Sequence, residues 1–80
     1  MDGKAERELT FGERAVGLTF NPSGDPTVNE LKTLSAALID ECSRQRETAN
    51  DAEVKRMYSL AITEAQTAQM WAVKAATWRK

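Results

Sequence analysis

Five consecutive positions combine the side chains in this chain that are best suited to chemistry: Phe20, Asn21, Pro22, Ser23 and Gly24. The ring of Phe20 offers a stacking surface, the next residue offers an amide, and the Pro-Ser-Gly turn exposes backbone donors. Lys32 follows about two turns into the next predicted helix. A ring and a cation suit a nucleobase with a phosphate, because stacking contributes about 1 to 3 kcal/mol per base and the cation adds a charge-assisted hydrogen bond.

The same residues also have a plainer interpretation. Phe20 can pack as a hydrophobic staple on the start of the following helix, and Lys32 can be a solvated surface residue. Spacing alone favours this packing interpretation over ligand binding.

Catalysis and metal binding lack their usual side chains. The sequence contains no His to shuttle protons near neutral pH, and Cys42 is its single Cys. It shows no Gly-rich phosphate loop and no Ser paired with a plausible base. Its carboxylates have the positions of helix caps and solvated faces: Glu13, Glu30, Asp40, Glu41, Glu47, Asp51, Glu53 and Glu64. We therefore expect a protein that is not an enzyme and that holds no metal and no cofactor.

Charge and hydropathy argue against two further classes. A net charge of -1 and a pI near 5.4 lack the basic stripe of a DNA-binding protein, although a small anionic ligand needs only a few cations. No segment approaches the ~20 apolar residues of a membrane span, and residues 1–8 lack the apolar core of a signal peptide. We expect a protein of the reducing cytoplasm.

Two signals predict a short helix near the start of the chain. Residues 1–9 are charged and are expected to fray. Thr10 and Glu13 then have the spacing of a capping box, which predicts a short helix over residues 10–17. Leu18–Phe20 is expected to be extended.

Two long helices are predicted to follow. Asp25 can cap and Pro26 suits the first helical position, with another capping signal one turn further, so the first long helix is expected over residues 25–45. Asn50, with a Glu three residues later, indicates the start of a second long helix over residues 51–79.

Both long helices carry apolar residues at helical spacing. The first has a stripe of Val28, Leu31, Leu34, Leu38 and Cys42, widened by Ala37 and Ile39. The second has a seam of Val54, Met57, Ala61, Ala65, Ala68, Ala72 and Ala75, with flanking Tyr58, Ile62, Met70, Trp71 and Trp78. Because small side chains let helices approach closely, we predict one all-α domain, residues 1–80, built as an antiparallel helical hairpin.

The small size of the chain suggests what covers the remaining apolar residues. A chain of 80 residues is marginal as a monomer and has too small a core to bury two tryptophans. We therefore expect Met70, Trp71 and Trp78 to face another copy in a compact homo-oligomer. In the alternative, both tryptophans merely lie over the edge of the hairpin.

The chain as a whole resembles a known family. The pattern combines Lys32, ten residues before Cys42, with three segments: Phe20-Asn21-Pro22, Ser59-Leu60-Ala61-Ile62-Thr63 and Ala68-Gln69-Met70-Trp71-Ala72. Over residues 19–79 it is similar to the bacteriophage anti-CBASS cyclic-oligonucleotide sponges, and its most specific part is residues 70–72. These sponges share a helical hairpin domain with the anti-Thoeris sponges, which hold a cyclic ADP-ribose isomer.

The resemblance implies a function. Such a protein is a homo-oligomer, a hexamer in the best-known members, that sequesters cyclic di- and trinucleotide immune signals without cleaving them. It acts in the cytoplasm of the infected host and withholds the signal from the effector. Phe20, which is Tyr in some members, matches the position that stacks on a base, and Lys32 matches the position that meets phosphate.

The resemblance also implies a second site, for cyclic trinucleotides, where subunits meet. Arg56 and Asn21 are the candidates for it, and Lys74 and Arg14 are further candidate cations. Each has a plain alternative: Arg56 as a surface residue, Lys74 as a solubilising residue beside Trp71, and the segment around Arg14 as packing.

A competing hypothesis is a helical protein–protein interaction module, whose tryptophan face grips another protein and which binds no small molecule. Both hypotheses predict oligomers and an apolar surface on the monomer. They differ at Phe20 and Lys32, which only the sponge requires. A nucleic-acid-binding accessory protein is disfavoured by the acidic pI.

Overall fold

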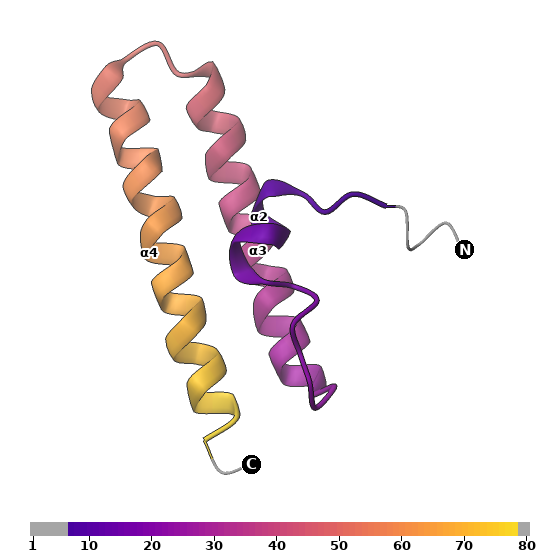
Figure 1. The fold of residues 1–80 in the computed structure, drawn as a ribbon. Coiled ribbons are helices and arrows are strands. Elements are labelled where there is room, and N and C mark those ends of the chain that lie inside the picture. The colour runs from indigo at the N-terminus through magenta and orange to yellow at the C-terminus, as the bar shows by residue number, and fades with distance from the viewer. Residues whose placement is uncertain (1–6, 79–80) are drawn as a thin grey trace.

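The computed structural model of the chain describes residues 7–78, and this part contains three helices and no strands. They are α2 (Phe11–Val16), α3 (Pro26–Thr48) and α4 (Ala52–Ala76). Figure 1 shows α3 and α4 side by side as an antiparallel hairpin, with α2 lying across α3. The all-helical hairpin is therefore as predicted. We expected residues 1–6 to fray and Arg79 to be helical, and both predictions fall on positions outside the described residues.

Local capping signals start the helices. The Thr10 side chain accepts a hydrogen bond from the Glu13 backbone at 3.0 Å, and the Glu13 carboxylate accepts one from the Thr10 backbone at 3.0 Å, so the predicted capping box is present. Asp25 caps α3 by accepting a hydrogen bond from the Thr27 backbone at 2.9 Å, and Pro26 occupies the first turn.

The later boundaries differ slightly from the prediction. Asp51, rather than Asn50, caps α4 by accepting a hydrogen bond from a backbone N–H at 2.7 Å. α3 continues to Thr48, beyond the predicted end at residue 45, because no Gly or Pro interrupts it before the connection. α4 ends at Ala76, and a turn over Thr77 and Trp78 follows, so the helix stops before its predicted end.

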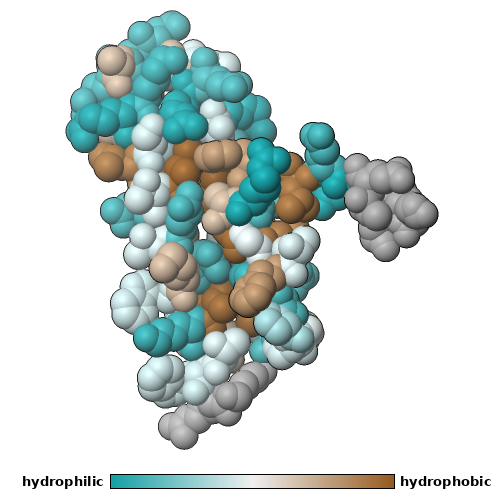
Figure 2. Space-filling model, in the orientation of Figure 1, coloured by the Kyte–Doolittle hydropathy of each residue, from teal (hydrophilic) through white to brown (hydrophobic). Residues whose placement is uncertain are grey.

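The hydrophobic core is small and lies where the three helices meet. Its buried residues come from all of them, and Ile39 is fully buried. The members are Val16, Ala36, Ile39, Cys42, Ile62 and Ala65. In Figure 2 hydrophilic residues cover the end of the hairpin that carries the α3–α4 connection, and hydrophobic residues gather below it. Within the described residues, no helix is both long and apolar enough to cross a membrane.

The predicted apolar stripe of α3 is partly wrong. Leu34 and Leu38 are 65% and 54% exposed, whereas Ala36 and Ile39 are buried. The buried face also includes Lys32, which interrupts the apolar pattern. α3 turns this face inward because it must meet both α4 and α2, and the small Ala36 lets α2 approach.

The predicted Ala seam of α4 is also partly wrong. Ala65 is buried as expected, but Met57 is half exposed and Ala68 is exposed. Ile62, which was assigned to a flanking face, is buried instead, since it offers more apolar area to α3 than an Ala does. α4 therefore turns Ile62 and Ala65 to the hairpin interior and several of its other alanines outward.

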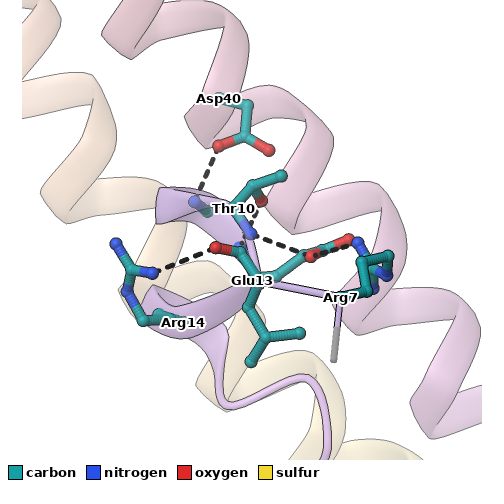
Figure 3. A network of polar contacts seen from close by, with 7 residues as sticks. Arg7, Thr10, Glu13, Arg14 and Asp40 are labelled. Carbon is teal, nitrogen blue, oxygen red and sulfur yellow. Dashed lines mark hydrogen bonds and ion pairs between the residues drawn. The ribbon is translucent and has the colours of Figure 1, made fainter. Parts of the chain in front are cut away.

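α2 is held on α3 by a hydrogen bond to Asp40 and by a close approach of the two backbones; Figure 3 shows the polar contacts. The backbone N–H of Gly12 donates a hydrogen bond to the Asp40 carboxylate at 2.7 Å. A Cβ at Gly12 would lie 2.2 Å from the Ala36 carbonyl oxygen, so only glycine fits here. Arg14 donates to the Leu9 carbonyl at 3.0 Å, which gives this candidate cation a local structural bond.

We predict that Gly12→Ala lowers the free energy of unfolding by about 3 kcal/mol, because the new methyl group pushes α2 away from α3. Gly24→Ala is the matched control: its backbone has φ 65° but open space around it, so that the expected loss is about 1 kcal/mol. Denaturant unfolding measures both. Equal losses would contradict the close contact.

We also predict that Glu13 makes stability fall in acid. The hydrogen bond from the Thr10 backbone, with the guanidinium of Arg7 beside it, holds the pKa of Glu13 below its ordinary value of 4.5. A lowered folded-state pKa stabilises the fold above the unfolded value, and this contribution disappears as the pH falls below 4.5 through the folded-state value.

Glu13→Gln keeps the capping geometry but cannot titrate. The variant should therefore lose less stability than the wild type between pH 4.5 and more acidic solution, as followed by thermal melting. Parallel acid profiles for the two proteins would count against this role of Glu13.

Candidate functional site

The segment that carries Phe20 begins with a glycine turn. Gly17 ends α2 in the left-handed conformation, with φ 64°. The Phe20 N–H then donates to the Gly17 carbonyl at 2.9 Å, which closes a turn over residues 17–20. The expectation of extended chain over Leu18–Phe20 is therefore wrong, because the left-handed glycine reverses the chain direction at once.

The next turn is braced by Asn21. Gly24 N–H donates to the Asn21 carbonyl at 2.9 Å, as the Asn-Pro-Ser-Gly sequence predicts. The Asn21 side chain donates to the Asp25 carbonyl at 2.9 Å and accepts from the Asp25 N–H at 3.2 Å. The structure thus uses the Asn21 amide to hold the loop on the start of α3.

Lys32 is buried beneath this loop, with only 5% of its surface exposed. Its ammonium donates to the Gly17 carbonyl at 2.9 Å and to the Phe20 carbonyl at 2.6 Å. Its Nζ lies 5.4 Å from the centroid of the Phe20 ring. Lys32 is therefore not the solvated residue that spacing alone favours.

Phe20 presents its ring to solvent. The residue is 71% exposed, so it does not pack as a staple on the start of α3. Lys32 instead hydrogen-bonds the backbone carbonyl of Phe20, and the exposed ring is free to stack on a ligand.

An open groove of about 290 Å³ lies beside this ring. Its lining combines most of the predicted loop with Lys32, Val28 of α3 and the end of α4: Phe20, Asn21, Pro22, Ser23, Val28, Lys32, Val73 and Thr77. Gly24 shapes the loop but does not line the groove. Val73 and Thr77 escaped the sequence analysis, although an antiparallel hairpin implies that the end of α4 returns to the start of α3.

The chemistry of the groove suits a planar, anionic ligand. Phe20 supplies an exposed ring, Val28 and Val73 an apolar floor, and Ser23 and Thr77 hydroxyl groups. None of the described lining residues carries a carboxylate, and Lys32 is the charged residue among them. No cluster of metal-ligating side chains occurs in the part of the chain that the structure describes.

Besides Gly24, two predicted ligand residues lie outside this groove, Arg56 and Lys74. Arg56 is in the first turns of α4, at the opposite end of the hairpin, and forms a two-point ion pair with Glu53 at 2.7 and 3.1 Å. Lys74 lies between two indoles, with its Nζ 5.3 Å from the Trp71 centroid and 5.8 Å from that of Trp78. These three residues and Ala75 line a separate open groove of about 430 Å³.

The outward face of α4 carries several large apolar residues. Met70, Trp71 and Trp78 are 64%, 66% and 68% exposed, and Met57 and Leu60 continue this face toward the start of the helix. Leu60, Trp71 and Trp78 lie on the side of α4 opposite the buried residues Ile62 and Ala65, and Met57 and Met70 flank them. A monomer in water leaves this surface uncovered.

Comparison with known families identifies the family of this chain. A family model described as the Acb2/Tad1 hairpin domain matches residues 13–77. The chain belongs to this family. No curated protein and no solved structure matches it.

Membership in the Acb2/Tad1 hairpin family confirms the resemblance to the anti-CBASS and anti-Thoeris sponges, and at the level of the family it implies an anti-defence protein that sequesters a cyclic nucleotide. The match begins at Glu13, within α2, and ends at Thr77. Every residue that lines the Phe20 groove therefore belongs to the Acb2/Tad1 hairpin domain.

We predict that Asn21→Ala lowers the free energy of unfolding by about 1 to 3 kcal/mol, because it removes both side-chain hydrogen bonds to Asp25. Ser23→Ala, at an exposed position of the same loop, should change it by less than about 0.5 kcal/mol. Denaturant unfolding compares the two variants. A neutral Asn21→Ala would show that the loop does not need this brace.

Proposed function

We propose that this protein is an anti-defence sponge that binds cyclic di- and trinucleotide immune signals in the Phe20 groove and releases them unchanged. The family match carries the proposal, since it spans the groove in which an exposed ring lies above a buried cation. The bound signal is withheld from its bacterial effector in the cytoplasm of the infected host.

The groove supports binding through its individual contacts. A base stacks on Phe20, at about 1 to 3 kcal/mol per base, and the hydroxyls of Ser23 and Thr77 offer hydrogen bonds to sugar or phosphate. The Lys32 ammonium contributes positive charge from below the ring. A ligand with a net negative charge meets no opposing carboxylate along this lining.

One groove is too small to hold the whole ligand tightly. Its volume of about 290 Å³ is at the lower limit for a small-molecule site. A sponge needs a high affinity, and ~10 nM corresponds to about 11 kcal/mol of binding free energy. We therefore propose a homo-oligomer, a hexamer as in the best-known members, in which a two-fold axis presents a second Phe20 to the other half of a nearly two-fold ligand.

The exposed α4 face supplies the surface for this assembly. Further copies cover Met70, Trp71 and Trp78, whose exposure leaves a large apolar area in water in the monomer. Arg56 lies far from Phe20 within one chain. We therefore propose that the cyclic trinucleotide site with Arg56 is a separate site, formed where subunits of the same oligomer meet. We propose that neither DNA nor a membrane is a partner.

The proposed activity is sequestration without chemistry. The groove lining contains neither a His nor a carboxylate that could serve as a general base, and phosphodiester cleavage needs such a group or a metal ion. A helical protein–protein interaction module is the second candidate, and it would use the same exposed tryptophans to bind another protein.

The test is isothermal titration of the purified protein with cyclic di-AMP, cyclic GMP–AMP, cyclic tri-adenylate and cyclic ADP-ribose isomers. We predict tight binding of at least one cyclic oligonucleotide, and a loss of about 5- to 150-fold in Phe20→Ala, as expected for one lost stacking contact. Phe20→Tyr keeps the ring and should keep most of the affinity.

Leu34→Ala is the matched control, because Leu34 is an exposed apolar residue of α3 that does not line the groove. Chromatography of the released ligand should recover it intact. Full affinity in Phe20→Ala would show that the ligand binds elsewhere. Recovery of cleaved ligand would refute sequestration without cleavage. No binding of any ligand by a folded oligomer would favour the interaction module.

A further inference from the structure

We propose that Lys32 is a positioning residue that fixes the Phe20 ring through the loop backbone and does not itself contact the ligand phosphate. This inference rests on the proposed function only for its binding test. Its basis is the placement of the ammonium, which lies under the loop with 5% of the residue exposed.

The hydrogen bonds of Lys32 explain how it acts on Phe20. The carbonyls of Gly17 and Phe20 accept two of the three donors of the ammonium, at 2.9 and 2.6 Å. The Gly17 carbonyl also accepts the Phe20 N–H at 2.9 Å. The ammonium therefore holds both ends of the turn over residues 17–20 and sets where the Phe20 backbone lies.

The ring itself is held by the same group. Nζ lies 5.4 Å from the ring centroid, within the range of a cation–π interaction. The loop offers few other restraints on a ring that is 71% exposed. Lys32 thus restricts the orientations of the ring before a ligand arrives, which lowers the entropy cost of stacking.

Direct contact with phosphate would disturb this arrangement. To reach a phosphate in the open groove, the ammonium would have to leave the two carbonyls that it now bonds, and the Phe20 carbonyl would lose its donor. The same movement would release the ring on which the base stacks. Direct phosphate contact and ring positioning are therefore competing roles, and they predict different couplings between Lys32 and Phe20.

A double-mutant cycle separates these roles. Lys32→Met keeps a long side chain in the buried slot but removes its donors, and Phe20→Ala removes the ring. Affinity is measured by titration with the cyclic oligonucleotide of the panel that binds the wild type most tightly. We expect Lys32→Met to lose about tenfold in the wild-type background and less than about twofold in the Phe20→Ala background, because the two residues act as a unit. Equal losses in both backgrounds would show an independent ligand contact and overturn the proposal.

A second measurement needs no ligand. With 4-fluorophenylalanine at Phe11 and Phe20, the ¹⁹F spectrum has one line from each ring, and Phe20→Ala identifies the line of Phe20. We expect Lys32→Met to shift or broaden the Phe20 line and to leave the Phe11 line in place. An unchanged Phe20 line would overturn the proposal, whereas a shift of both lines would show a general loss of structure and also count against it.

Lys32→Gln, a shorter polar residue that cannot reach both carbonyls, serves as a second variant in both experiments if Lys32→Met does not fold. The two hypotheses fail in different ways. If the wild type binds none of the panel, the proposed function fails while the ¹⁹F result still decides the positioning role. If Phe20→Ala weakens binding but Lys32→Met loses the same affinity in both backgrounds, the proposed function is supported and the positioning role is refuted.

Discussion

The buried ammonium of Lys32 is the interaction on which the arrangement of the loop depends. Removing an ammonium from water is costly unless hydrogen bonds replace its hydration. Here the replacements are the Gly17 and Phe20 carbonyls, at 2.9 and 2.6 Å. Gly17 also ends α2. One side chain of α3 therefore connects the end of α2, the loop and the groove.

The starts of α2 and α3 could be predicted from the sequence because capping is a local interaction. Thr10 with Glu13, and Asp25 with Pro26, act within a few residues of each other and need no tertiary partner. The buried faces were harder to predict. Leu38 is exposed because the inner face of α3 is shared with α2, and only the tertiary contact at Gly12 reveals that sharing.

The candidate site was predictable to a similar extent. Residue types alone indicated the loop around Phe20, since a turn, an amide and a ring are adjacent in the chain. Periodicity could not indicate that Lys32 is buried, because a Lys at that position normally indicates a solvated face. Thr77 lines the groove because the antiparallel hairpin brings the end of α4 beside the start of α3. The same arrangement places Arg56, at the start of α4, at the other end of the hairpin.

The groove lies at the open end of the hairpin, opposite the short connection between α3 and α4. In a helical hairpin the contacts near the connection are local in sequence and close first, whereas Val28 and Val73 at the open end must close the longest loop of the hairpin. Sub-global opening can therefore begin at the groove while the core around Ile39 and Ile62 stays intact. A ligand held between the two helix ends would oppose this opening. Its binding would therefore slow amide hydrogen exchange most strongly at the open end of the hairpin, where the unliganded protein is least stable.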